Sequence, residues 1–296
     1  MSRTLPRILL LGRNGQVGWE LQRTLAPLGE VVALGRDDVD LAAPDQIRAA
    51  VRAHLPRVIV NAAAYTAVDR AESEPDAAFA INARAPGILA EEAARAGALF
   101  VHYSTDYVFD GSGTRPYTEE DEVGPRSVYG RSKLEGEQAV QAACEAHLVF
   151  RTSWVYGTRG ANFLRTMLRL FAEREEVRVV ADQHGAPTWS RMIAEATALV
   201  LGPACAGVAQ RSGVYHLTAG GATTWHGFAS AIHGAVAGGC ATRVVTPIGT
   251  EDYPTPASRP AYSVLSTEKL RNELGVVLPD WEDSLALVLA EIGGAE

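Results

Sequence analysis

The chain has 296 residues, of which 47% are hydrophobic and 21% charged, a balance typical of a globular protein with a sizeable core. Its 27 basic and 35 acidic residues give a net charge of −8, which argues against a nucleic acid or an anionic membrane as partner. The 3 cysteines, Cys144, Cys205 and Cys240, are far apart and indicate buried, reduced thiols. No apolar run is long enough for a membrane span or a signal sequence, so the composition predicts a cytoplasmic enzyme.

A dinucleotide-binding turn is predicted close to the N-terminus. Residues 8–11 form a continuously apolar strand, and residues 19–28 have the pattern of a helix. Between them, Gly12, Gly15 and Gly18 form a G-x-x-G-x-x-G pattern. These glycines would let the backbone approach a pyrophosphate, whose charge is met by amides at the helix N-terminus. The alternative is a glycine-rich turn that binds no ligand.

The residues after the second strand, 31–34, bear on the choice of cofactor. An acidic residue at this strand end would bind the ribose hydroxyls of NAD, whereas an arginine can pair with the additional phosphate of NADP. Arg36 therefore favours NADPH, with NADH as the alternative. In the other interpretation Arg36 is a solvated charge, and Asp37 or Asp38 binds the ribose.

Two further strands, residues 58–60 and 99–103, should end at the ligand-binding edge of the sheet. The first leads into small side chains that would let a cofactor pass close to the backbone: Asn61, Ala62, Ala63, Ala64, Tyr65 and Thr66. The second leads into Thr105 and Asp106, which can bind a carbonyl or a sugar hydroxyl, or can simply cap a turn. Between the two strands, Pro86 predicts a kink near Ala85 in a helical stretch that ends near residue 97.

Tyr129 and Lys133 stand four residues apart at the start of a predicted helix, so the phenol and the ammonium share one face. A nearby fixed cation favours the phenolate and would lower the pKa of Tyr129, making it a usable proton donor. Only 2 of the 27 basic residues are lysines, which suggests that a compact ammonium is required here. The alternative is an ordinary amphipathic helix start.

The regular alternation of strands and helices predicts an α/β fold with a Rossmann-type doubly wound parallel sheet. We expect residues 1–157 to form the NADP-binding domain and residues 158–296 a smaller, mixed α/β region that mainly binds substrate. Some segments of this second region should return to the sheet, residues 214–217 among them. Other elements expected there are helices over residues 163–174, 190–201 and 280–292 and a strand over residues 177–180.

Six motifs in this order resemble those of the dTDP-4-dehydrorhamnose reductase family, within the extended branch of the short-chain dehydrogenase/reductase superfamily. They are GRNGQVGWELQ (12–22), NAAAYTAVD (61–69), YSTDYVFDG (103–111), YGRSK (129–133), RTSWVYG (151–157) and DQHGAPT (182–188). The resemblance implies reduction of the C4 ketone of dTDP-4-dehydro-β-L-rhamnose by a nicotinamide cofactor, the last step of dTDP-rhamnose biosynthesis.

The resemblance also implies a role for each matching residue. Tyr129 would protonate the C4 oxygen, Lys133 would hold the nicotinamide ribose, and Thr105 would bind the developing alkoxide. Asp106 would bind a sugar hydroxyl, and Trp154 would form a wall of the sugar pocket. Matching cofactor positions are Gly15, Gln16 and Val17 at the pyrophosphate, Asp40 and Leu41 near the adenine, and Ala64, Tyr65 and Thr66 along the nicotinamide half.

The chain departs from the family at two places. Members that dimerise around magnesium use three glutamates; Glu20 and Glu291 match two of them, but Ser190 and Arg191 stand where the third acid is expected. Neither the magnesium nor that homodimer is therefore supported, and the 7 scattered histidines suggest no other metal site. Gly35 stands where some members carry an acidic ribose ligand, which strengthens the preference for NADPH.

Three other functions compete with this interpretation. The 4,6-dehydratases of the same branch use a Thr-Asp-Glu sequence, whereas this chain has Thr105, Asp106 and Tyr107, which argues against dehydration. A 4-ketoreductase for another dTDP-4-keto-6-deoxyhexose would share the same motifs. A non-catalytic regulatory subunit of the same fold has no physical reason to retain Thr105, Tyr129 and Lys133 together, so catalysis is favoured.

Overall fold

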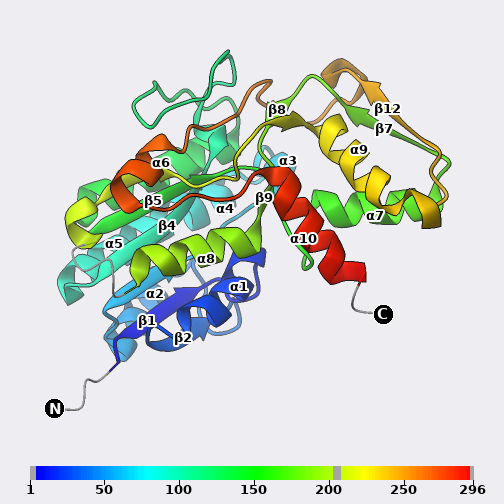
Figure 1. Cartoon of the computed structure of the whole chain (residues 1–296). Helices are drawn as coiled ribbons and strands as arrows, with labels where there is room; N and C mark the ends of the chain where they lie inside the picture. The colour runs from blue at the N-terminus through cyan, green and yellow to red at the C-terminus, as the bar shows by residue number, and fades with distance from the viewer. Residues whose placement is uncertain (1–4, 203–207, 294–296) are drawn as a thin grey trace.

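The computed structural model describes residues 5–202 and 208–293, so Cys205 lies outside the described residues. One sheet of six strands organises the molecule, in the order β10-β5-β4-β3-β1-β2, with every neighbouring pair parallel (Figure 1). The strands are β1 (Arg7–Leu11), β2 (Glu30–Leu34), β3 (Val58–Asn61), β4 (Leu99–Thr105), β5 (His147–Thr152) and β10 (Gly213–His216). This arrangement confirms the predicted Rossmann-type sheet, including the return of a late segment as β10.

Helices cover both faces of the sheet. One face carries α1 (Gln16–Leu25), α8 (Ser190–Leu201) and a π-helical turn (Leu270–Leu274), and the other carries α2 (Pro44–His54), α5 (Ala85–Ala96) and α6 (Val128–Ala143). The apolar run of β1 serves both faces because alternate side chains of a strand point to opposite sides. Ile8 and Leu10 therefore pack towards α1 and α8, whereas Leu9 and Leu11 pack towards α2 and α5.

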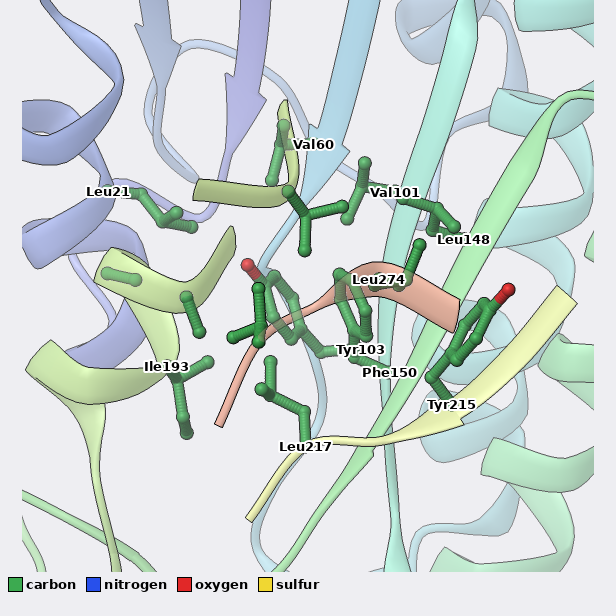
Figure 2. Packing of buried hydrophobic residues seen from close by; sticks show 14 of the residues in the cluster. Leu21, Val60, Val101, Tyr103, Leu148, Phe150, Ile193, Tyr215, Leu217 and Leu274 are labelled. Atoms are coloured by element: carbon green, nitrogen blue, oxygen red, sulfur yellow. The ribbon is translucent and has the colours of Figure 1, made fainter. Parts of the chain in front are cut away.

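The core on the α1 and α8 face is built from aromatic as well as aliphatic side chains. Figure 2 shows Tyr103 of β4 and Phe150 of β5 at its centre, with Ile193 of α8 to one side and Tyr215 of β10 to the other. The rings of Tyr103 and Phe150 lie 6.1 Å apart, and those of Phe150 and Tyr215 lie 6.4 Å apart. This packing ties the late strand β10 into the same core as the early strands.

The helical stretch between β3 and β4 is interrupted before Pro86, near the predicted kink. Helices α3 (Val68–Ala71) and α4 (Pro75–Phe79) are followed by a π-helical turn (Ala80–Arg84), and α5 begins at Ala85. Pro86 stands in the first turn of α5, where its missing amide hydrogen costs no helical hydrogen bond. The π turn absorbs the distortion, as such turns do within α-helices.

The second part of the molecule has a core of its own, visible beside the sheet in Figure 1. It is formed by α7 (Phe163–Glu173), α9 (Trp225–Val236), α10 (Trp281–Gly293) and the parallel pair β7 (Glu176–Val180) and β12 (Val244–Ile248). Short pairs join it to the sheet region: β6 (Val155–Tyr156) with β9 (Thr188–Trp189), and β8 (His184–Gly185) with β11 (Thr223–Thr224). The remaining elements are 3₁₀ turns at Asp106–Val108, Val208–Arg211, Ala237–Gly239 and Thr250–Asp252.

Strand order fixes where a ligand can lie. Strand β1 lies between β2 on one side and β3 on the other. The connection that leaves β1 leads to β2, and the connection that leaves β3 leads away from it to β4, so the two diverge at the carboxyl ends of β1 and β3. Open α/β sheets bind ligands in the crevice at such a switch point. No helix in the described ranges combines the length and the apolar character needed to cross a bilayer.

Candidate active site

The glycine turn after β1 has the geometry that a dinucleotide needs. Gly12 has a φ of +85°, a conformation that favours glycine, and a Cβ there would lie 2.6 Å from Ala63 N. A Cβ on Gly18 would collide with the carbonyl oxygen of Gly12, so this glycine lets α1 pack directly on the turn. Gly15 precedes α1, and the nearest atom to a Cβ there is 3.4 Å away. The turn and the amides that open α1 therefore fit a phosphate group.

Four other predicted cofactor residues surround this turn in different ways. The Gln16 side chain is tied to the second part of the molecule, because its Oε1 accepts from Asn162 Nδ2 at 2.9 Å. Val17 packs against the core of the α1 and α8 face. The Asp40 carboxylate closes a turn by accepting from the backbone amide two residues later, at 2.9 Å, and Leu41 packs against the opposite core.

The charged side chains after β2 differ in whether they are paired. Asp38 is engaged twice, because it accepts from Gly35 N at 2.7 Å and pairs with Arg13 at 2.9 Å. Arg36 is exposed, and no acidic side chain among the described residues pairs with it. Asp37 is exposed as well, and no cation among the described residues pairs with it, so the loop offers one guanidinium, Arg36, and one carboxylate, Asp37, at this position.

The loop after β3 is held by two buried asparagines. Asn61 Oδ1 accepts from Ala63 N at 3.2 Å, and Asn82 Oδ1 accepts from Tyr65 N at 2.8 Å while its Nδ2 donates to the Tyr65 carbonyl at 3.0 Å. These bonds leave the small side chains of Ala62, Ala63, Ala64 and Thr66 partly or fully exposed. The loop therefore presents backbone to the switch-point crevice, as the sequence pattern predicts.

Tyr129, Thr105 and Asp106 come together where α6 meets the end of β4. The Ser127 hydroxyl caps α6 by accepting from Gly130 N at 3.1 Å, which fixes the first turn that carries Tyr129. The Thr105 hydroxyl donates to Asp106 Oδ1 at 2.9 Å and accepts from Tyr107 N at 3.2 Å, and it lies close enough to the Tyr129 phenol to influence the pKa of that group. A phenol, a hydroxyl and a carboxyl thus lie next to one another in one buried polar chain.

Burial controls the protonation of this chain. Desolvation raises the pKa of Tyr129 well above its usual value, and the nearby charges of Asp106 and Tyr107 act in the same direction. Desolvation also raises the pKa of Asp106 to about 6. Its Oδ2 has no hydrogen-bond partner within the described ranges, and the neighbouring Ser263 hydroxyl donates instead to the His184 carbonyl at 3.3 Å. A buried acceptor without a partner suits a ligand hydroxyl.

Lys133 corrects one expectation. The sequence predicts that its ammonium lowers the pKa of Tyr129, but in the structure Lys133 Nζ donates to the Tyr103 carbonyl at 2.6 Å and contacts His102 Nε2 at 3.2 Å. The pKa of Tyr129 is therefore raised, because burial outweighs any nearby cation. Lys133 is 1% exposed, and desolvation lowers its own pKa to about 8.

Trp154 forms a stacked pair that the sequence did not predict. Its ring lies 3.5 Å from that of Trp225, with an angle of 5° between the planes. Trp154 has a φ of +47°, and a Cβ on Gly185 would collide with its indole ring, so three segments together hold the ring in place. Both tryptophans are partly exposed, which leaves aromatic surface for a sugar ring or a base.

Two charged clusters near the site were also missed. Arg259 pairs with Asp69 at 2.7 Å and donates to the Tyr107 hydroxyl at 3.0 Å, and the Tyr107 ring stands edge-on to Tyr129 with centroids 5.5 Å apart. Behind Lys133, Glu137 and Arg151 form a buried ion pair at 2.7 Å. The proline-rich segment around Arg259, residues 250–261, gave no sequence signal for its contacts.

The magnesium-type site is filled by a side chain. Arg191 reaches Glu20 at 3.2 Å and Glu291 at 2.6 Å, so one guanidinium lies between the two glutamates that match the family pattern. No cluster of His, Cys, Asp and Glu among the described residues could hold a metal ion. The residues present do not fit magnesium, because the Arg191 guanidinium already occupies the space between the two carboxylates, and Arg23 also pairs with Glu20, at 3.4 Å.

The glycine turn at one side of the crevice and the Tyr129–Lys133 helix at the other define an oxidoreductase of the short-chain dehydrogenase/reductase superfamily. A family model described as the RmlD substrate binding domain matches residues 6–293. A dTDP-4-dehydrorhamnose reductase of Burkholderia thailandensis is 53% identical over 294 residues, covering 97% of this chain and 99% of that protein. The chain belongs to the dTDP-4-dehydrorhamnose reductase family.

Other relatives agree with this assignment. The dTDP-4-dehydrorhamnose reductase of Escherichia coli K12 is 47% identical and covers 96% of this chain and 97% of its own length. Among solved structures, a dTDP-4-dehydrorhamnose reductase from Clostridium acetobutylicum has a TM-score of 0.91 and 38% identity, covering 97% of this chain and 99% of its own. One from Bacillus anthracis, in complex with NADP, has a TM-score of 0.89 and 35% identity over the same shares of the two chains.

Proposed function

We propose that Tyr129, Thr105 and Lys133 carry out the reduction of the C4 ketone of dTDP-4-dehydro-β-L-rhamnose by NADPH, giving dTDP-β-L-rhamnose. The activity follows from the family: the protein is an NAD(P)H-dependent dTDP-4-dehydrorhamnose reductase of dTDP-rhamnose biosynthesis. The observation that carries the residue roles is the burial of the Tyr129 phenol next to Thr105 and Asp106, with the Thr105 hydroxyl donating to Asp106 Oδ1 at 2.9 Å.

The reaction needs a proton at the C4 oxygen as hydride reaches the carbon, and the hydride is supplied by the bound nicotinamide. Tyr129 is protonated across the neutral range because burial raises its pKa, so it has a proton to give. The Thr105 hydroxyl lies beside the phenol and donates to Asp106 Oδ1 in this structure, and it would turn that proton to the same developing alkoxide once substrate is bound. General acid catalysis of this kind contributes roughly 10²–10⁴ in rate.

NADPH is the preferred cofactor in this proposal. The adenosine phosphate of NADP would pair with the exposed guanidinium of Arg36, whereas Asp38 is already bound to Gly35 N and Arg13. A related enzyme from Bacillus anthracis was solved with NADP, which agrees with this choice. Lys133 would hold the nicotinamide ribose, and residues 61–66 would line the nicotinamide half.

The substrate would lie between the sheet and the region after residue 157. Asp106 Oδ2, buried and without a partner among the described residues, would accept a sugar hydroxyl. The stacked rings of Trp154 and Trp225 would form a wall of the sugar pocket, with Trp225 contributed by α9 of the second part. Residues 158–296 are in this proposal mainly the substrate-binding region.

The experiment follows the oxidation of NADPH and of NADH by the full chain with dTDP-4-dehydro-β-L-rhamnose, and identifies the product by NMR. We expect dTDP-β-L-rhamnose, with NADPH preferred by about 10-fold or more because a charge-assisted pair is worth roughly 1.5–3 kcal/mol. Arg36→Gln should remove most of that preference, whereas Arg57→Gln serves as a distant control. A folded protein that binds NADPH but reduces only another dTDP-4-keto-6-deoxyhexose would overturn the substrate assignment.

A further inference from the structure

A buried polar chain connects Lys133 to the cofactor loop through a histidine that the mechanism above does not use. His102, on β4, is 0% exposed. Its Nε2 lies 3.2 Å from Lys133 Nζ, and its Nδ1 lies 3.2 Å from Asn61 Nδ2. Asn61 in turn accepts from Ala63 N through its Oδ1, at 3.2 Å. The chain therefore runs from α6 across β4 and β3 to residues 61–66.

Counting protons along this chain restricts Lys133. A neutral imidazole has one N–H and one acceptor nitrogen, whereas an ammonium only donates. If Asn61 Nδ2 donates to Nδ1, the imidazole proton is on Nε2 and points at Lys133 Nζ, which must then be a neutral amine. If Lys133 is an ammonium, the proton must be on Nδ1, and the Asn61 amide must turn its oxygen away from Ala63 N to accept it.

We propose that His102 is a positioning residue for Lys133. The His102 ring changes tautomer whenever Lys133 gains or loses its proton, and Asn61 transmits this change to the amide of Ala63. The inference deepens the proposed function, since it concerns the lysine assigned to the nicotinamide ribose. It couples the charge beside the ribose to the backbone of the loop that would bind the same cofactor.

The surroundings favour a switch between tautomers rather than a charged histidine. Burial and the neighbouring Lys133 lower the pKa of His102 well below its usual value, so the ring stays neutral. Other ionisable groups that face this chain lie on α6, β5 and the turn after β4. Glu137 pairs with Arg151, and its charge still raises the pKa of Lys133 against the effect of burial. Tyr129 lies beside Asp106.

The test is ¹⁵N NMR of the histidine rings in the full chain, from about pH 6 to about pH 10, with His102 assigned through the signal missing from His102→Gln. We expect a neutral ring throughout, with the proton on Nδ1 at low pH and on Nε2 at high pH and a midpoint near the Lys133 pKa of about 8. In Lys133→Met the tautomer should no longer depend on pH. A charged imidazolium, a single tautomer at every pH, or a switch that survives in Lys133→Met would each overturn the proposal.

A second readout uses the reaction. In His102→Gln the oxygen of the new glutamine amide can accept from the Lys133 ammonium without any change at Asn61, which stabilises the charged lysine. The limb of the pH profile of kcat/KM that reports the titration of Lys133 should therefore move to higher pH. A limb that stays in place while the variant remains folded contradicts the coupling. Because the NMR test needs neither substrate nor cofactor, a switching ring in a chain without reductase activity would refute the proposed function and leave this inference standing.

Discussion

Two of the glutamate–arginine clusters among the described residues have different surroundings. Below the Tyr129 helix, Glu137 and Arg151 are 1% and 5% exposed and pair at 2.7 Å. At the corner where α1, α8 and α10 meet, Arg191 is 26% exposed and reaches Glu20 and Glu291, which are 7% and 38% exposed. The first cluster is cut off from water and borders the reacting groups, whereas the second is partly hydrated and borders none of them.

This difference shows that the same kind of ion pair, glutamate with arginine, serves a different purpose in each cluster. The charge of Glu137 raises the pKa of Lys133 and so opposes the desolvation that lowers it. The Arg191 pairs instead hold three helices together and occupy the position that a bridging cation would take. Removing charge from the first cluster should affect catalysis and folding, while changing the second should affect mainly the local corner.

The largest expected effect comes from the lysine that the buried cluster surrounds. Lys133→Met removes the cation proposed to hold the nicotinamide ribose and should lower kcat/KM by roughly 10²–10⁴. Lys133→Arg should recover little of the loss, because a planar guanidinium cannot reproduce the bond to the Tyr103 carbonyl in this buried space. Steady-state kinetics with NADPH measure both variants. Full activity in Lys133→Arg would show that any cation suffices.

A matched pair of substitutions compares the two clusters directly. Glu137→Gln leaves Arg151 as an uncompensated buried charge and should lower the free energy of unfolding by about 3–5 kcal/mol. Glu291→Gln breaks one partly exposed contact of Arg191, which retains Glu20, and should cost only about 0–1 kcal/mol. Urea denaturation of both variants at one pH gives the comparison. Equal losses would show that burial does not distinguish the clusters.

Asp106 extends the comparison to a buried carboxyl without an arginine. Its pKa rises from 3.8 to about 6 in the folded chain, so the native state binds this proton more tightly than the unfolded state does. The resulting stabilisation is present below about pH 4 and is lost as the pH rises through about 6. Between these values, wild type should lose roughly 3 kcal/mol relative to Asp106→Asn. Urea midpoints at several pH values test this, and a constant difference would contradict the raised pKa.

The smallest expected effect concerns the corner cluster. Wild type should show no change in melting temperature on addition of magnesium, because the Arg191 guanidinium already occupies the space between the two glutamates. Arg191→Glu would place a third carboxylate there, and magnesium should then stabilise the fold by about 1–3 kcal/mol at concentrations well above its dissociation constant. Arg191→Gln, which removes the charge without adding a ligand, is the control. Magnesium stabilisation of wild type would contradict the account.

Much of the fold follows from local pattern. The apolar run of β1 and the glycines after it determine a strand, a turn and a helix with no information from elsewhere in the chain. The pKa direction of Tyr129 could not be predicted, since it depends on how deeply the packed chain buries the phenol. The partners of Arg191 are likewise 171 and 100 residues away in sequence. The sequence showed that Arg191 stands where the family has an acid, but it did not show the ion pairs that Arg191 forms.

The polar chain behind Lys133 shows the same limit. Asn61 faces His102 because β3 and β4 pair in one particular register, in which these two residues are opposite each other. Sequence spacing gives each strand separately but does not give the register between strands. The role of Gly12, Gly15 and Gly18 was predictable because it is local to one turn. The role of His102 depends on the packing of β3, β4 and α6 against one another, which the sequence does not show.

The central claim is that Tyr129 delivers the proton during reduction. The most direct measurement compares wild type with Tyr129→Phe, using oxidation of NADPH with dTDP-4-dehydro-β-L-rhamnose and, separately, NADPH binding by fluorescence. We expect unchanged binding and a fall in kcat of roughly 10²–10⁴, because the phenylalanine ring keeps the packing and lacks only the hydroxyl group that donates the proton. A variant that binds NADPH and reduces the sugar at the wild-type rate would contradict it.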